Sequence, residues 1–363
     1  MAPKIYSSTL LRGASLAALL GLTLLGCGGS DFPERYAIEG LRIAAVQADP
    51  PWLGAGEQTT LRPLVLGIDP SGPAPIYHYS WCPLRGTSSV AFECLLTIPY
   101  LNSLFAKENV PLELPDDFYE IGTSSSAEAI FPPRGISISQ LYENLCSQLQ
   151  KEEDLELPST VALPDCSAPT VTVNVELELT QGERTIYAYK DVTFILDPAL
   201  AGTRNTNPDL SALELKVVQT GTTSATFDTE VDLEVTPDDP QSFFNLSQIV
   251  TETSTITGLT LSSRCEQVIF TWLVTAGELN FYRTGFLPDT IDDPANPCPA
   301  PTTTPASPST FAEAYQTLRE NEWLSPYAED IEGSGPVELY IVARDDRGGQ
   351  SWIKRDIYLE GNP

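Results

Sequence analysis

Strict alternation of apolar and polar residues is the strongest pattern in the chain, and it predicts strands. Between residues 170 and 180 almost every second residue is Val or Leu, and the residues between them are Thr, Asn or Glu. A period of two places the apolar side chains on one face of a strand. Gln181-Gly182 then forms a tight turn and residues 184–196 run back, which predicts a β-hairpin. The same alternation, between turns rich in Pro, Gly and Asp, predicts further strands at 38–48, 59–68, 76–82, 212–219, 226–236, 253–262, 267–276, 279–286, 337–344 and 351–360.

Two of these strands carry a tryptophan on the apolar face. Trp81 shares its face with two Tyr residues, while His78 lies on the other face. Trp272 shares its face with a Phe and two Val residues. We therefore expect both indoles to lie in a core. The likeness of the two Trp strands, and of the hairpins at 170–196 and 337–360, indicates a two-copy repeat.

Two segments lack the strand pattern, and we interpret them as insertions, at 83–168 and 287–334. Within the first, residues 138–150 carry apolar side chains at helical spacing. Ser137 and Gln140 fit a capping box just before them, so we expect a helix there. The second insertion is rich in Pro, Thr and Ser, which is typical of a solvated loop.

The N-terminus has the pattern of an export signal. Two basic residues precede or interrupt an apolar run that ends at Leu24-Leu25-Gly26-Cys27 and is too short for a stable membrane span. This run resembles the lipobox of bacterial lipoproteins, which implies a lipoprotein signal peptide at 1–27, a lipidated Cys27 and a tether at 28–36. Gly28 after the cysteine favours the outer membrane. The alternative is an ordinary secretion signal with a chance cysteine.

The charge of the chain limits its partners. The sequence has 20 Lys and Arg residues against 49 Asp and Glu residues, a formal net charge of −29. Nucleic-acid binding needs a basic face for phosphate contacts, and none is visible, so we expect no nucleic-acid partner.

The remaining cysteines form an even set, which in an exported protein predicts disulfides. By proximity we pair Cys265 with Cys298. For the other four we favour Cys82–Cys94 and Cys146–Cys166. The alternative is the crossed pairing, Cys82–Cys166 and Cys94–Cys146. A single His and the lack of a Cys-x-x-Cys pair disfavour a zinc site, and we expect no cofactor.

Four segments of the second half carry a family resemblance: Trp272–Gly277, Tyr282–Gly285, Asn321–Pro326 and Val342–Gly349. They resemble motifs of immunoglobulin-like and polycystic-kidney-disease-like domains, which have a strand tryptophan, a Trp-x-x-Pro segment and an Asp-x-x-Gly turn. Together with the lipobox, the chain is similar to uncharacterised lipoproteins of myxobacterial type. The resemblance implies an all-β fold with two immunoglobulin-like β-sandwich domains in tandem. Their expected bounds are 37–200 and 211–363, with a linker at 201–210.

Catalytic motifs are absent or misplaced. Ser351 and Lys354 match the Ser-x-x-Lys signature of penicillin-binding enzymes, but on a strand positions three apart point to opposite faces. His78 is the only histidine, and no Gly-x-Ser-x-Gly elbow accompanies it. We expect no catalytic residues and no enzyme activity.

Acidic pairs in turns are the remaining candidates for a metal site. Asp238-Asp239, Asp292-Asp293 and Asp345-Asp346 offer carboxylate oxygens of the kind calcium prefers. None of them has the spacing of a calcium loop, and Asp is common in turns because it bonds its own backbone. We therefore expect no metal site, with a weak calcium site at one of these turns as the alternative.

These patterns predict a membrane-anchored envelope lipoprotein in the outer membrane, with a non-enzymatic binding, adhesion or structural role. A protein or glycan ligand would bind at loops displayed on the rigid sandwiches, above all at the two insertions. The alternative is a cell-envelope hydrolase with a carboxylate site near the first insertion. A cleft with two close carboxylates, one of them buried, would favour the hydrolase.

Overall fold

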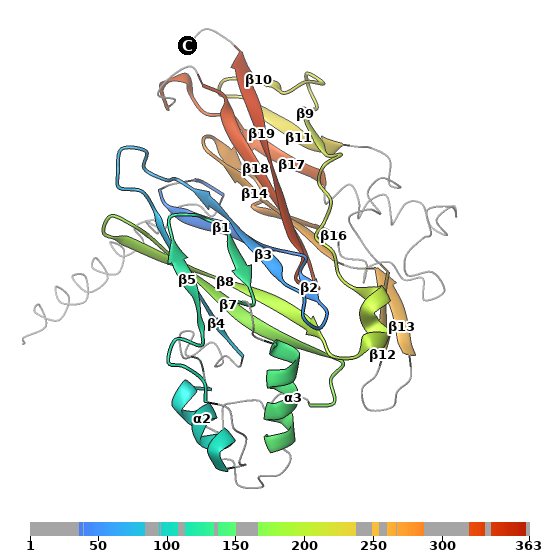
Figure 1. The fold of residues 1–363 in the computed structure, drawn as a ribbon. Coiled ribbons are helices and arrows are strands. Elements are labelled where there is room, and N and C mark those ends of the chain that lie inside the picture. Colours follow the sequence, from blue (N-terminus) through green and yellow to red (C-terminus); the bar gives the residue numbers. More distant parts are fainter. Residues whose placement is uncertain are drawn as a thin grey trace, which may run out of the picture. The chain divides into compact units, whose positions relative to one another are not determined.

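The fold consists mainly of β-strands, arranged as two sandwiches that follow each other along the chain (Figure 1). The structure is a computed structural model, and the described residues belong to one compact unit, Arg35–Pro363. The described residues are 36–38, 40–83, 94, 96–107, 113–133, 137–149, 166–236, 249–253, 260–265, 267–286, 319–330 and 335–360.

The first sandwich has a three-stranded and a five-stranded sheet. The smaller sheet has the order β1-β3-β6 and the larger one the order β2-β8-β7-β4-β5. β2 runs parallel to β8, and all other neighbours are antiparallel. The strands are β1 (Arg42–Asp49), β2 (Trp52–Leu53), β3 (Thr59–Leu66), β4 (Ile76–Cys82), β5 (Glu120–Ser124), β6 (Ala129–Phe131), β7 (Thr170–Gln181) and β8 (Arg184–Ile195).

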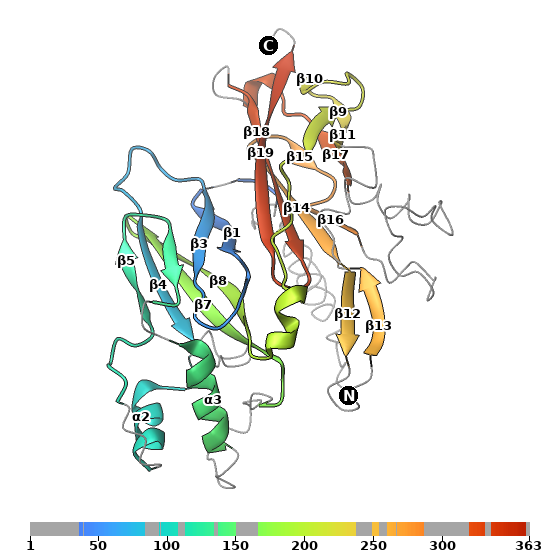
Figure 2. The ribbon, with the colours of Figure 1, turned by 45° about the vertical axis from the view of Figure 1, so that its right-hand side comes forward.

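The second sandwich repeats this order. Its five-stranded sheet is β10-β19-β18-β14-β16, again with one parallel pair, β10 and β19 (Figure 2). Its other sheet is β15-β17-β11-β9. The strands are β9 (Glu214–Val217), β10 (Ser224–Thr226), β11 (Glu230–Thr236), β14 (Val268–Val274), β15 (Glu278–Leu279), β16 (Arg283–Phe286), β17 (Glu320–Leu324), β18 (Val337–Asp345) and β19 (Gln350–Glu360).

The two sandwiches therefore share their strand order, with β15 as an extra strand in the second. This confirms the predicted fold class: all-β, with two immunoglobulin-like sandwiches and partly helical insertions. A tryptophan buried on a central strand is a hallmark of that architecture. A separate hairpin of β12 (Ile249–Thr253) and β13 (Thr260–Cys265) lies between β11 and β14 in the chain.

Both predicted core tryptophans are buried. Trp81 is 2% exposed and packs edge-on against Tyr119, with ring centroids 5.2 Å apart. Trp272 is fully buried and donates from Nε1 to Thr284 Oγ1 at 2.8 Å. Truncating such a side chain to Ala typically costs about 3–5 kcal/mol, so each indole is a main stabilising element of its sandwich.

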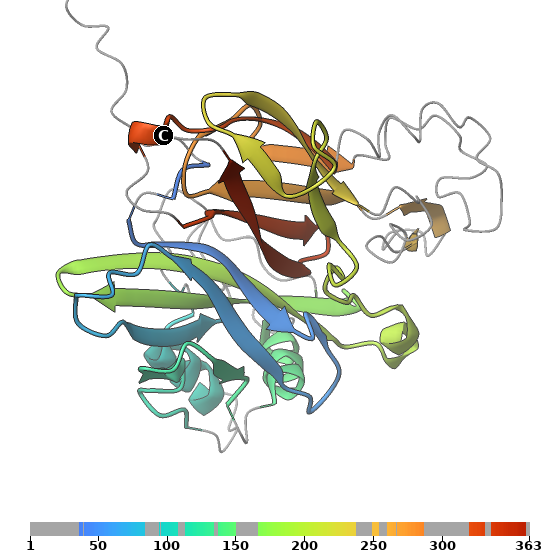
Figure 3. The ribbon, with the colours of Figure 1, turned by 90° about the horizontal axis from the view of Figure 1, so that it is seen from above.

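The β7–β8 hairpin follows the alternation of its sequence. Val173 pairs with Val192 across the hairpin, and both are buried. Gly182 at the turn has φ +62°, a backbone conformation that L-residues with side chains rarely adopt. Seen from above, the two long strands run side by side (Figure 3).

The expected insertions need correction, because three short strands of the sandwiches lie inside them. β5 and β6 fall within 83–168 and complete the two sheets of the first sandwich, and β17 falls within 287–334. The rest of the first insertion contains two helices, α2 (Ile98–Lys107) and the predicted α3 (Ile138–Leu149). Ser137 Oγ accepts from Gln140 N at 3.3 Å, as expected for the N-terminal residue of the predicted capping box.

A third apolar cluster joins the two sandwiches. Ala45, Leu64 and Leu66 of β1 and β3 pack against Leu273 of β14 and Val342 of β18. The last two residues lie on the outer face of the five-stranded sheet, away from Trp272. Part of the outer face of the second five-stranded sheet is therefore covered by the first sandwich.

Candidate functional site

Two of the three predicted disulfides are confirmed. Cys82–Cys94 and Cys146–Cys166 are both formed, each with Cα atoms 5.5 Å apart, which excludes the crossed pairing. Both bridges tie the helical part of the first insertion to neighbouring residues. The pairing of Cys265 with Cys298 stays a prediction, because Cys298 lies outside the described residues.

The predicted lipidation site, Cys27, also lies outside the described residues. Within the part of the chain that the structure describes, no helix has the length and apolar character needed to cross a bilayer.

The Ser-x-x-Lys match is not assembled as a catalytic pair. Ser351 Oγ accepts from Gln47 Nε2 at 3.2 Å, and Lys354 forms an ion pair with Glu338. The hydrogen bond to Glu338 raises the pKa of Lys354, whereas a lysine acting as a base needs a lowered pKa.

His78 is placed on the outer face of β4, as predicted. Its Nε2 lies 2.5 Å from Glu120 Oε2, and both side chains are partly exposed. The contact is that of a surface pair.

Asp345, the first residue of the last acidic pair, is buried and holds the β18–β19 turn through hydrogen bonds. Its carboxylate accepts from Arg347 N at 2.9 Å, Gly349 N at 2.7 Å and Asn205 Nδ2 at 3.1 Å. These bonds lower its pKa, but burial outweighs them and raises it. Among the described residues, no group of three or more His, Cys, Asp or Glu side chains could hold a metal ion.

The turn at Asp345 meets the first sandwich through a buried lysine. Lys190 of β8 is 2% exposed and donates from Nζ to Gly348 O. Burial lowers the pKa of Lys190 to about 8, while the charge of Asp345 opposes that shift. Trp52 Nε1 donates to Arg347 O at 3.0 Å, and the Arg347 guanidinium lies 4.3 Å from the Trp52 ring centroid. We call these contacts, together with the apolar cluster at Leu273, the junction.

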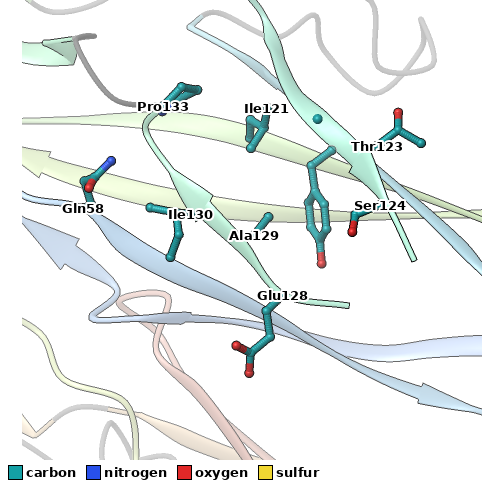
Figure 4. A pocket seen from close by; sticks show the side chains of 10 residues that line it. Gln58, Ile121, Thr123, Ser124, Glu128, Ala129, Ile130 and Pro133 are labelled. Atoms are coloured by element: carbon teal, nitrogen blue, oxygen red, sulfur yellow. The ribbon is translucent and has the colours of Figure 1, made fainter. Parts of the chain in front are cut away.

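An open groove of about 540 Å³ lies between β5 and β6 of the first sandwich. These strands are edge strands of different sheets, so each pairs on one side only among the described strands. Figure 4 shows Ile121, Thr123 and Ser124 along one side, Ala129 and Ile130 along the other, and Glu128 at one end. Tyr79, Gln58, Gly122 and Pro133 complete the lining.

This first groove lacks convergent catalytic groups. Its one carboxylate, Glu128, accepts from Arg62 Nε at 2.9 Å. The Tyr79 hydroxyl donates to Ala127 O at 2.7 Å, and burial raises its pKa well above the usual range. The lining suits contact with a neutral partner more than proton transfer.

A second groove of about 400 Å³ lies at the corresponding place in the second sandwich, beside β16 and β17. Three carboxylates line it, from Asp232, Glu320 and Glu322, together with Arg283 and Phe281. Asp232 and Glu322 are paired across β11 and β17, both are exposed, and each accepts from a side-chain amide. The buried carboxylate that would favour a hydrolase is not part of this lining, and the groove lies far along the chain from the first insertion.

Sequence patterns missed both grooves and the junction. Most of the groove residues lie on or next to strands of three to five residues with mixed composition, for which alternation gives little signal. The strand pattern around Lys190 does not reveal that this side chain is buried, because its burial depends on a turn 158 residues away.

No protein-family model matches the chain, and a search of curated proteins gives no match. Among solved structures, it is similar to murine CEACAM1b, at 10% identity over 87% of this chain and 98% of that one, with a TM-score of 0.19. It is similar to extracellular domains 3–5 of Drosophila OTK, at 9% identity over 90% and 99%, with a TM-score of 0.19. For three N-terminal domains of the outer capsid protein Hoc of bacteriophage RB49, identity is 9% over 88% and 59%, with a TM-score of 0.16. Scores this low carry no argument, so the fold class rests on the sheets themselves.

Proposed function

We propose that this protein is a lipid-anchored envelope protein that works by binding rather than catalysis. Lipid on Cys27 would attach it to the outer membrane through the tether at 28–36. The domains at 37–200 and 211–363 would then display a binding surface for a protein or glycan.

One observation carries the binding part of this proposal: the groove between β5 and β6. It is open, it lies between two edge strands, and its only carboxylate is paired with an arginine. Such a groove offers backbone donors and acceptors together with apolar side chains, which are the contacts of recognition. Eight of its ten lining residues lie between 83 and 168, the segment where the sequence led us to expect binding.

The junction supports the same proposal. Apolar packing at Leu273 and Val342 and the buried contact between Lys190 and Gly348 join the sandwiches. Contacts of this kind would restrain the orientation of a binding groove, and such preorganisation lowers the entropic cost of binding.

The anchor is tested by metabolic labelling with an alkyne-bearing fatty acid, followed by membrane fractionation. We expect the wild type to be labelled and to sediment with outer membranes, and Cys27→Ser to lose both properties. Ser30→Ala is the matched control and should stay labelled. An unlabelled wild type in the soluble fraction would overturn the anchor.

The binding role is tested with soluble protein from residue 28 onward, immobilised and exposed to detergent-solubilised envelopes. We expect saturable retention of an envelope component that free protein displaces. Retention of nothing, with or without calcium, would contradict the binding role.

A further inference from the structure

The smaller sheet of the second sandwich carries two pairs of carboxylates directly opposite each other. β11 and β17 pair Asp232 with Glu322 and, two residues further along each strand, Glu234 with Glu320. Like charges placed opposite each other on neighbouring strands are destabilising. A positive charge nearby would therefore stabilise either pair.

The chain itself supplies positive charge to one of the two pairs. The Glu234 carboxylate forms ion pairs with Lys216 at 2.6 Å and with Arg319 at 2.5 Å. Its side chain is only 9% exposed. Two basic side chains of the protein thus neutralise Glu234 and cover it.

The other pair has no such cation within the part of the chain that the structure describes. Asp232 Oδ2 accepts from Gln219 Nε2 at 2.9 Å, and Glu322 Oε2 accepts from Asn280 Nδ2 at 2.5 Å. Both donors are neutral amides, so the two negative charges remain. Asp232 and Glu322 are exposed, and both line the 400 Å³ groove beside β16 and β17 (Figure 2).

Buried polar residues form another part of this groove and fix an exposed aromatic ring in it. Asn321 is 3% exposed, and its side chain donates to Phe281 O at 2.7 Å and accepts from Phe281 N at 3.1 Å. Thr284, also buried, accepts from Trp272 Nε1 at 2.8 Å. The Phe281 ring itself is 53% exposed. One groove therefore presents a ring on a fixed backbone together with two carboxylates that lack a counter-charge.

The single basic residue of the lining does not supply that counter-charge. The Arg283 guanidinium lies 5.3 Å from the centroid of the Tyr282 ring, and among the described residues it forms no ion pair. Three carboxylates and one guanidinium leave the groove with an excess of negative charge.

We infer that this groove binds an arginine side chain of a partner protein, with the guanidinium between Asp232 and Glu322 and against the Phe281 ring. The planar fork of arginine donors matches carboxylates, and its flat face stacks on aromatic rings. The net charge of −29 also favours the approach of a basic partner. The inference goes beyond the proposed function, which rests on the groove between β5 and β6.

The test is an NMR titration of the nitrogen-15-labelled soluble chain, from residue 28 onward with its disulfides intact, in about 0.15 M salt. The ligand is a capped peptide, Gly-Ser-Arg-Leu-Gly, and the control peptide has citrulline in place of arginine. Citrulline has nearly the same shape and no charge. We expect saturable shifts at the amides of Phe281, Thr284 and Glu322, and at least about tenfold weaker binding of the citrulline peptide.

Three variants locate the binding. Glu322→Gln should weaken the arginine peptide by about tenfold. Glu183→Gln makes the same change of charge at the exposed β7–β8 turn and should leave the affinity unchanged. Phe281→Ala should weaken the peptide by about threefold or more, because it removes the ring on which the guanidinium stacks. The amide spectrum of each variant reports whether it is folded, so a loss of binding is not mistaken for a loss of structure.

Several results would overturn the inference: no binding to the wild type, equal binding of the two peptides, or no effect of Phe281→Ala. Equal effects of Glu322→Gln and Glu183→Gln would do so too, because the charge of the whole protein would then attract the peptide. Calcium chloride is titrated in parallel, and saturable calcium binding at the same amides, tighter than that of the arginine peptide, would make the occupant a metal ion and also overturn it. None of these results concerns the groove between β5 and β6, so the proposed function is tested separately.

Discussion

The two five-stranded sheets have the same strand order but opposite surroundings on their outer faces. In the first sandwich that face is polar and exposed: His78 pairs with Glu120, Tyr189 donates to Glu176, and Tyr187 is 54% exposed. In the second, Leu273 and Val342 stand on the same face and are buried against β1 and β3. One face is in water and the other forms the junction.

The difference shows how one fold takes two roles by substitution at alternate positions. Core-facing residues have to be apolar in both sheets, because each sandwich needs its own core. Outer residues are free to vary, and here they decide whether a face is exposed or packed. The charged outer face of the first sheet also disfavours stacking of a further copy in the way that the second sheet is packed.

The largest expected effect comes from the buried turn that meets Lys190. Asp345→Ala removes the acceptor of two backbone N–H groups and of Asn205, and removes one of the two negative charges near Lys190, the other being that of Asp191. We expect the free energy of unfolding to fall by about 3–5 kcal/mol, measured by urea denaturation. Asp346→Ala, at the exposed neighbour, is the control and should cost about 1 kcal/mol or less. An equal loss of stability in the two variants would show that the Asp345 carboxylate does not stabilise this turn.

The apolar junction should show the next largest effect. Leu273→Ala leaves a cavity between the sandwiches and should cost about 2–4 kcal/mol. Tyr187→Ala, on the exposed face of the first sheet, should change stability by about 0.5 kcal/mol or less. If both substitutions are neutral in thermal unfolding, the second face is not packed as described.

The pH dependence of stability should reveal Lys190. Burial lowers its pKa to about 8 in the folded protein, against about 10.4 when exposed. Between these values the folded state has released a proton that the unfolded state keeps, so this group makes stability rise with pH. Asp345, Asp191 and Arg344 face it and set the size of the effect.

The comparison with Lys190→Met isolates this contribution. As pH rises from 8 to 10.5, the wild type should gain on the order of 1–3 kcal/mol relative to the variant, measured by urea denaturation at each pH. Below pH 8 the difference should be flat. Parallel pH profiles would show that Lys190 titrates as an exposed lysine.

The smallest effect is expected at the exposed pair on the first face. Glu120→Gln removes the charge next to His78. Because both side chains are partly solvated, we expect a change of about 1 kcal/mol or less in the free energy of unfolding near pH 6. A loss above about 2 kcal/mol would mean that this face is not the solvent-exposed surface described here.

Alternation alone was enough to predict the long strands. Residues 76–82 are β4 with the predicted bounds, and the hairpin at 170–196 differs by one residue at its ends. The repeat was also visible, because Trp81 and Trp272 mark the same strand in each copy. These features depend on local sequence, which is why they could be predicted.

The features that rely on distant contacts could not be predicted. β5 contains Gly122 and only one apolar residue, so its pairing with β4 leaves no periodic signal. The predicted strand at 226–236 is two strands, β10 and β11, which belong to different sheets.

Amide hydrogen exchange of β6 and β17, read by NMR, tests the central difference between the copies most directly. The account predicts that amides of Ala129–Phe131 exchange much faster than those of Asn321–Trp323, because among the described strands β6 has one neighbour and β17 has two. Equal, strong protection of the two strands in the free protein would contradict it, since β6 would then be paired on both sides like β17.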